Sequence, residues 1–102
     1  MWLLVDDKRD LNCDCIARNY EVAIQLVHLN IWDCICLDHD LGEEKTGYDV
    51  LSLIIDLLDK DELPERFQLV TSNPVGRDRM GKLLLNHGYK TINNIDYYKE
   101  EK

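Results

Sequence analysis

Short apolar runs alternate with amphipathic stretches along most of the chain. Residues 2–5 (WLLV) and 33–38 (DCICLD) are too short for buried helices and meet acidic residues, which predicts buried strands. A similar strand is predicted at 67–71 (FQLVT), and weaker patterns predict strands at 13–17 and around 91–95. We therefore expect about four to five strands.

Three amphipathic helices are predicted between these strands. The first covers 20–29 after an asparagine that can cap it, and the second covers 47–60, where apolar residues recur at helical spacing. The third begins at Asn73-Pro74, because asparagine is a good N-cap and proline fits the first helical position, and it ends near Gly88.

Strands that alternate with helices indicate an α/β fold with a mostly parallel sheet covered by helices on both faces. We therefore expect a three-layer domain, and the length of 102 residues fits a single domain over 1–102. Only five residues separate Asp7 from the strand at 13–17, which is too few for a helical crossover. That weak strand is therefore predicted to be an edge or hairpin element.

Composition and charge narrow the functional classes. Hydrophobic residues at 45% and charged residues at 31% are typical of a globular protein. A net charge of −8 repels phosphate backbones, so neither bulk nucleic-acid binding nor membrane association is expected. The N-terminal apolar run meets acid at Asp6, unlike a signal peptide or a spanning helix, and we expect a cytoplasmic protein whose Cys34 and Cys36 are core thiols.

Three predicted strands end in polar side chains that parallel packing would bring to one edge of the sheet. These residues are Asp6 and Asp7, Asp38, and the run from Thr71 to Asn73. Charges about 4 Å apart repel by roughly 4 kcal/mol at an effective dielectric near 20, so three gathered aspartates need a cation. Oxygen ligands at a phosphate site favour Mg²⁺, which we predict as the cofactor held by Asp6, Asp7 and Asp38. Each aspartate alone could equally be a turn or cap residue.

Basic and titratable residues flank the same predicted edge. Arg77 lies in the first turn of the helix capped by Asn73, where backbone N–H groups and the helix dipole favour an anion, and Arg9 follows the acidic pair. Either arginine could instead be a surface charge. His39, which precedes Asp40, is either a general acid or base or a loop histidine bonded to its neighbours.

Four strings resemble the cyclic-phosphate processing receiver domains, relatives of the flavodoxin-like receiver domains of two-component signalling: VDDKR (5–9), LDHDLG (37–42), TGYDVL (46–51) and SNPVGRDRM (72–80). The resemblance implies that Asp6 and Asp7 help to hold Mg²⁺ and that Asp38 is both a metal ligand and a phosphate acceptor. It also implies that Thr71 or Ser72 supplies a hydroxyl to the phosphoryl group.

Two departures from a receiver are evident in the sequence. The space between Asp7 and the second strand leaves out the first receiver helix. Receivers end their fifth strand with a lysine, whereas the matching region here offers Asn93 and Asn94, and Lys90 comes too early. We expect arginine to replace that lysine.

Three functions remain open. In the first, a Mg²⁺-dependent enzyme acts on a small phosphoester, with Asp38 or a water activated by His39 or Asp40 as nucleophile. The resemblance implies that the substrate is a cyclic phosphate of a nucleotide or RNA end. Arg9, Arg77, Ser72 and Asn73 would then bind the phosphate. In the second, Asp38 is the phosphoacceptor of a signalling receiver. The third is a non-catalytic phage or defence-related module that binds a protein partner.

Overall fold

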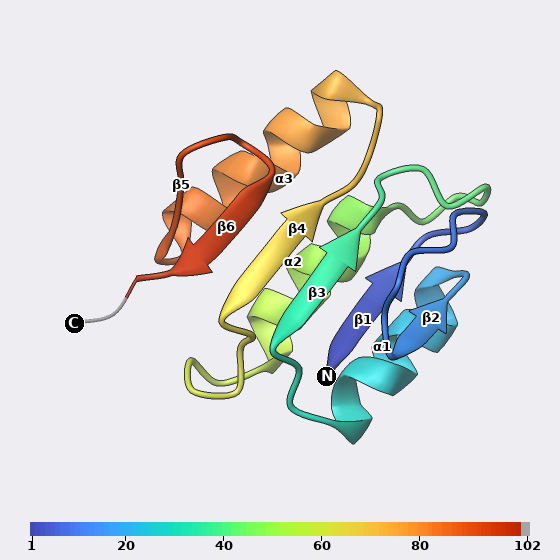
Figure 1. Ribbon diagram of the computed structural model, residues 1–102, viewed down its shortest axis with the longest axis horizontal. Helices are drawn as coiled ribbons and strands as arrows, with labels where there is room; N and C mark the ends of the chain where they lie inside the picture. The colour runs from blue at the N-terminus through green and yellow to red at the C-terminus, as the bar shows by residue number, and fades with distance from the viewer. Residues whose placement is uncertain (101–102) are drawn as a thin grey trace.

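The computed structural model describes residues 1–100 and shows one six-stranded sheet with three helices (Figure 1). The strands are β1 (Trp2–Val5), β2 (Cys15–Ala17), β3 (Cys34–Leu37), β4 (Arg66–Leu69), β5 (Tyr89–Thr91) and β6 (Asp96–Lys99). The helices are α1 (Tyr20–Leu29), α2 (Gly47–Leu57) and α3 (Pro74–Asn86). Among the described residues no helix is both long enough and apolar enough to cross a membrane.

The strand order is β2-β1-β3-β4-β6-β5. β1 pairs in parallel with β2 and β3, and β3 pairs in parallel with β4, whereas β6 is antiparallel to both β4 and β5. The predicted α/β class and mostly parallel sheet are confirmed, with six strands in place of four to five. Because β1, β3 and β4 are parallel neighbours, their carboxyl ends meet at one edge.

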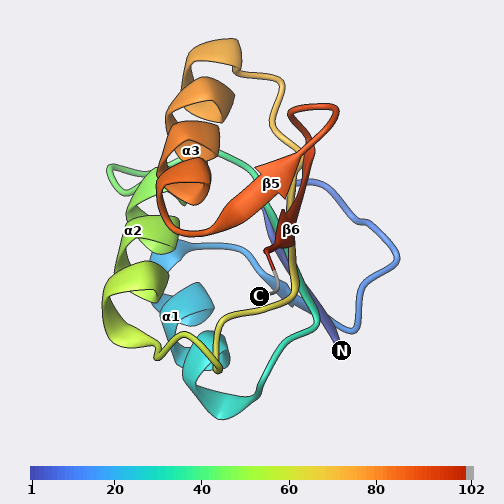
Figure 2. The ribbon, with the colours of Figure 1, turned by 90° about the vertical axis from the view of Figure 1, so that its left-hand side faces the viewer.

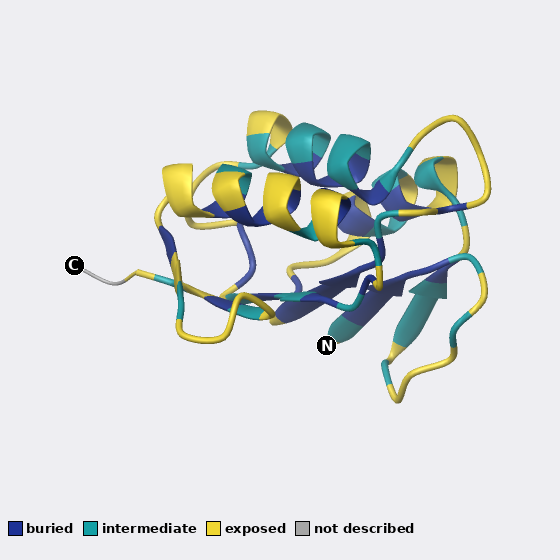
Figure 3. Cartoon of the chain, turned by 90° about the horizontal axis from the view of Figure 1, so that it is seen from above, coloured by how far each residue is buried: buried dark blue, intermediate teal, exposed yellow. Residues whose placement is uncertain are grey.

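All three helices cover the same face of the sheet, so the predicted third layer is not formed (Figures 2 and 3). The chain passes outward from β1 to β2 and then back past β1 to β3. When both of these connections are right-handed, they lie on opposite faces of the sheet. The connection from β1 to β2 is the loop 6–14, which contains no helix. The first receiver helix is therefore missing, as predicted, and its layer is missing with it.

The weak second strand is an edge strand, as predicted, but it is parallel to β1 rather than part of a hairpin. An extended loop over 6–14 reaches about 30 Å at roughly 3.3 Å per residue, more than enough to return along so short a strand. The backbone N–H of Asp14 donates to the Trp2 carbonyl at 3.0 Å, and Asp14 Oδ2 accepts from the Trp2 N–H at 2.7 Å. These bonds secure a crossover made without a helix.

The predicted last strand around 91–95 is wrong, because most of that segment is a turn between β5 and β6. Asn94 takes a φ of 61°, which asparagine tolerates well. The side chain of Asn93 accepts backbone hydrogen bonds from Ile95 and Asp96 at 2.9 and 2.8 Å. The residues after this turn, for which no strand is predicted from the sequence, form β6, whose Tyr97 pairs with Phe67 of β4.

The main core lies between the sheet and the helices. Strand residues such as Leu3, Ile35 and Phe67 are fully buried there against the apolar faces of the helices. On the opposite face Cys34 and Cys36 are 1% exposed and pack with Leu4, so the prediction of core thiols on one side of β3 is confirmed. This rigid sheet fixes the positions of the side chains at its edge.

Candidate functional site

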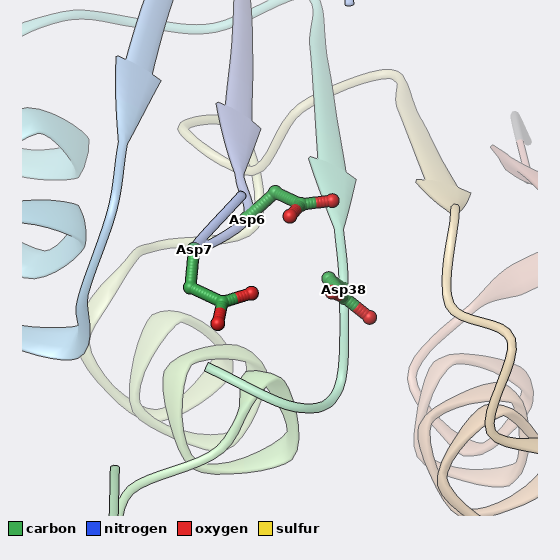
Figure 4. Close-up of side chains that lie close together, drawn as sticks. All are labelled: Asp6, Asp7 and Asp38. Atoms are coloured by element: carbon green, nitrogen blue, oxygen red, sulfur yellow. The ribbon is translucent and has the colours of Figure 1, made fainter. Parts of the chain in front are cut away.

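Three aspartates converge at the carboxyl edge of the sheet (Figure 4). Asp6 and Asp7 directly follow β1, and Asp38 directly follows β3, the strand beside it. One ligand oxygen from each carboxylate lies within 4.8 Å of the others. The structure thus places together the three residues that the sequence predicts as metal ligands.

Asp6 is held by its own loop and buried, with 1% of its surface exposed. Its Oδ1 accepts hydrogen bonds from the backbone N–H groups of Lys8 at 3.0 Å and Arg9 at 2.9 Å. Its Oδ2 is also buried but receives no hydrogen bond, and the nearest cation is Arg9 Nη1 at 3.3 Å. A buried carboxylate oxygen without a donor favours a bound cation.

Asp38 is 9% exposed and makes two contacts with neighbouring donors. The backbone N–H of His39 donates to Asp38 Oδ1 at 2.8 Å, and the Thr71 hydroxyl donates to the carboxylate from the end of β4. Burial raises the pKa of the Asp38 carboxyl, the hydrogen bond from Thr71 opposes that shift, and the charge of Asp6 adds to it. Burial therefore disfavours the ionised form of Asp38, and a cation bound at the cluster would favour it.

This raised pKa predicts a pH dependence of stability in the cation-free protein. Because the folded pKa of Asp38 exceeds its unfolded value near 3.9, the contribution of Asp38 to stability is fully present below that value and is lost as the pH rises through the folded pKa. In EDTA, Asp38→Asn should gain in melting temperature over wild type between pH 4 and 7. A gain of about 1 kcal/mol corresponds to roughly 4–8 °C in a domain of this size. Asp56→Asn, on the exposed side of α2, should show no such gain, and an equal gain in both variants would contradict the assignment.

The donor set fits a hard divalent cation. Three carboxylates offer only oxygen, which suits Mg²⁺, and Mg²⁺ completes its coordination with water or substrate phosphate. The buried Oδ2 of Asp6, which accepts no hydrogen bond in the described chain, supports the same fit. Asp6, Asp7 and Asp38 would hold the cation.

Gly47 brings the first turn of α2 against the backbone of Asp38. A Cβ at Gly47 would lie 1.8 Å from the Asp38 carbonyl oxygen, so no larger residue fits. The Gly47 N–H donates to the His39 carbonyl at 2.8 Å, and Thr46 with Asp49 forms a capping box that fixes where the helix begins. This packing holds the residues that follow β3 at the edge of the sheet.

His39 lies beneath the first turn of α3, with 12% of its side chain exposed. A Cβ at Gly76 would meet its ring at 2.3 Å, and its Nε2 is buried without a hydrogen bond. Its Nδ1 lies 3.3 Å from Asp40 Oδ1 and 3.4 Å from Asn73 Nδ2. Only Nδ1 has polar partners, so the predicted acid–base role requires this nitrogen and the mostly exposed Asp40.

The first turn of α3 offers fewer free donors than the sequence suggests. Asn73 caps the helix, and its Oδ1 accepts from the backbone N–H groups of Val75 and Gly76, both at 3.1 Å. Those two N–H groups are not available to a phosphate, and a phosphate-binding role for Asn73 is limited to its Nδ2. The Ser72 side chain is exposed and forms no hydrogen bond within residues 1–100, whereas Thr71 is buried and contacts Asp38.

The two predicted arginines both reach backbone carbonyls of the segment that follows β4. Arg9 pairs with Asp6, and its Nη1 also donates to the Val70 carbonyl, so it already neutralises part of the site. Arg77 makes one long contact of 3.5 Å from Nη1 to the Thr71 carbonyl and no ion pair within the described residues. Arg77 is therefore the better available phosphate ligand.

The antiparallel β6 explains the missing lysine. Because β6 is antiparallel to β4, its amino end, which Asn94 and Ile95 precede, lies at the edge of the sheet that carries the acidic cluster. Its carboxyl end lies at the opposite edge. Lys90 lies on the outer strand β5, where its Nζ is 2.6 Å from Glu100 Oε2. The carboxyl end of β6, the place where a receiver's last strand carries its lysine, therefore lies away from the site.

Residues 1–86 match the family described as cyclic-phosphate processing receiver domain. The chain belongs to this family. The matched region ends with α3 at Asn86, so the β5–β6 hairpin lies outside the residues matched. A search of the curated proteins finds no match to the chain.

Membership confirms the receiver-like fold and associates this receiver domain with cyclic-phosphate processing. The sequence alone identified its acidic residues from their positions after predicted strands. It left Thr71 and Ser72 open as the hydroxyl, because only the direction of the chain after β4 buries Thr71 and exposes Ser72. The close approaches at Gly47 and Gly76 had no interpretation in the sequence beyond the family strings that contain them.

Proposed function

We propose that this receiver domain is a divalent-cation-dependent phosphoesterase that opens a cyclic phosphate on a small nucleotide or RNA end. The observation that carries the proposal is the convergence of Asp6, Asp7 and Asp38 within 4.8 Å, with a buried Asp6 oxygen that lacks a donor. The association of the family with cyclic-phosphate processing supports the choice of substrate. A net charge of −8 favours a small substrate over a long polynucleotide.

When bound, the cation supplies Lewis-acid polarisation of the phosphoryl group and neutralises developing charge. Arg77 binds the phosphoryl oxygens from the side of α3, since its guanidinium forms no ion pair within the described chain. Thr71 and the His39 N–H orient Asp38 through its carboxylate oxygens. Asp40, with His39 Nδ1 beside it at 3.3 Å, accepts the proton of the attacking water.

In this reaction water adds to phosphorus and one ring P–O bond breaks. The proton that water loses goes first to Asp40 and is available to the alkoxide that leaves the ring, so the product is an acyclic phosphate monoester. This balance needs no second reactant besides water.

The proposal is tested by incubating the protein and Mg²⁺ with 2′,3′-cyclic nucleotides and ADP-ribose cyclic phosphate and following monoester formation. Wild type should form product, and Asp38→Asn should lose about 10³-fold in rate, the equivalent of roughly 4 kcal/mol of transition-state stabilisation. Asp56→Asn removes a carboxylate from the exposed side of α2 and should retain full activity.

Two results would contradict a phosphoesterase. The first is an absence of product from every substrate, and the second is turnover that Asp38→Asn leaves intact. A stable, acid-labile phosphate on Asp38 after treatment with acetyl phosphate, without turnover, would instead support the signalling receiver.

A further inference from the structure

A cavity lies between α3 and the β5–β6 hairpin, beside the segment that follows β4. It has a volume of about 350 Å³ and is lined by Pro74, Arg77, Leu85, Asn94 and Tyr97, among others. Figure 2 shows the hairpin packed beside α3. Pockets that bind small molecules occupy about 300–1,000 Å³, so this space suits a ligand of nucleoside size.

The cavity contains polar groups that have no partner in the protein. The Tyr97 hydroxyl lies over Gly81, where a Cβ would be 2.3 Å away, and no residue among 1–100 hydrogen-bonds to it. The side-chain amide of Asn94 likewise forms none in this part of the chain, since only its backbone N–H is used. Asp78 and Lys82 form an ion pair at 3.1 Å, which leaves Arg77 as the lining cation without an ion pair in the described chain.

Arg77 connects the cavity to the acidic cluster. It lines the cavity, and its Nη1 lies 3.5 Å from the carbonyl of Thr71, the residue whose hydroxyl contacts Asp38. A phosphate held between Arg77 and the cluster would therefore place the rest of its molecule toward the hairpin.

We infer that this cavity is the subsite for the nucleoside part of the substrate, in which Tyr97 and Asn94 donate and accept hydrogen bonds and Leu85 supplies apolar contact. The inference rests on the proposed function and names the substrate class as a nucleoside cyclic phosphate. One wall comes from the hairpin, which lies outside the residues 1–86 matched by the family.

Kinetics with matched variants test the subsite. Tyr97→Phe removes the unpartnered hydroxyl, and Leu85→Ala removes a half-exposed apolar side chain. The matched controls are Tyr98→Phe and Leu57→Ala, whose side chains lie outside the cavity and are 50% and 52% exposed. Each cavity variant should raise KM for 2′,3′-cyclic AMP by roughly 3–10-fold, the effect of one lost hydrogen bond or apolar contact. Neither should change kcat/KM for ethylene phosphate, a cyclic phosphate without a nucleoside.

Binding of adenosine provides a measurement that is independent of turnover. In wild type, NMR titration with adenosine should shift the backbone amides of Gly81, Asn94 and Tyr97 saturably, and Tyr97→Phe should weaken the binding. Shifts confined to other residues, or equal KM values in cavity and control variants, would overturn the subsite. If no cyclic phosphate is hydrolysed but adenosine binds here, the proposed function fails while the cavity remains a nucleoside site.

Discussion

Gly47→Ala should destabilise the domain by at least about 3 kcal/mol, the upper range for overpacking a tight site. The added Cβ would lie 1.8 Å from the Asp38 carbonyl oxygen and 2.8 Å from its carbonyl carbon, and both are backbone atoms that cannot rotate away. Either α2 must move outward or the chain after β3 must shift. The first response loses apolar contacts of Val50 and Leu51, and the second displaces Asp38 from the edge of the sheet.

Urea denaturation measures this effect, and Gly88→Ala is the matched control. Gly88 has a φ of 89° but no atom within 4 Å of an added Cβ, so alanine there introduces backbone strain without a clash. That strain costs about 1–2 kcal/mol. Equal losses at the two positions would show that α2 tolerates displacement and that the close approach does not fix Asp38.

Asp6→Asn should abolish cation binding while preserving the fold of the loop. Asparagine keeps an oxygen that can accept the N–H groups of Lys8 and Arg9, at 3.0 and 2.9 Å from Asp6 Oδ1, but replaces the buried Oδ2 with an amide that cannot bind a cation. For wild type, Mg²⁺ at 100 times its dissociation constant should stabilise the protein by about 2.7 kcal/mol relative to EDTA. In the variant this difference should vanish, and turnover should fall by about 10³-fold.

Asp10→Asn tests whether the effect is specific to the cluster. Asp10 lies on the same loop and also pairs with an arginine, Arg18, but its side chain is 77% exposed and lies outside the three-carboxylate group. This variant should keep the full Mg²⁺-dependent shift in melting temperature. A wild-type protein whose melting temperature is the same in Mg²⁺ and EDTA would remove the basis of the cation site.

The elements that the sequence predicted well are those with strong local signals. β1 and α1 occur at the predicted residues, because four apolar residues followed by acid and an asparagine cap before an amphipathic stripe are both local features. The predicted helix over 47–60 ends earlier, at Leu57, and the segment around 91–95 is a turn. The error at the helix end arose because helix periodicity continued past the last helical residue. The error around 91–95 arose because β-propensity competed with turn-forming residues.

The candidate site was predictable in its acids and less so in its donors. Asp6, Asp7 and Asp38 follow strands, so a parallel sheet was enough to bring them together. The roles of Ser72, Asn73 and His39 depended on how α3 begins, which the sequence could not place in three dimensions. The structure turns Ser72 outward, commits Asn73 Oδ1 to capping and buries Nε2 of His39.

The sequence by itself determined the α/β alternation, the missing first receiver helix and the acidic residues at the strand ends, because each depends on local spacing along the chain. Tertiary structure alone decided that β2 is parallel to β1, that the helices share one face and that β6 runs antiparallel to β4. These features depend on pairing between distant segments, and their direction has no local signature. The direction of β6 keeps a lysine away from the site and places Asn94 and Tyr97 along the cavity next to Arg77.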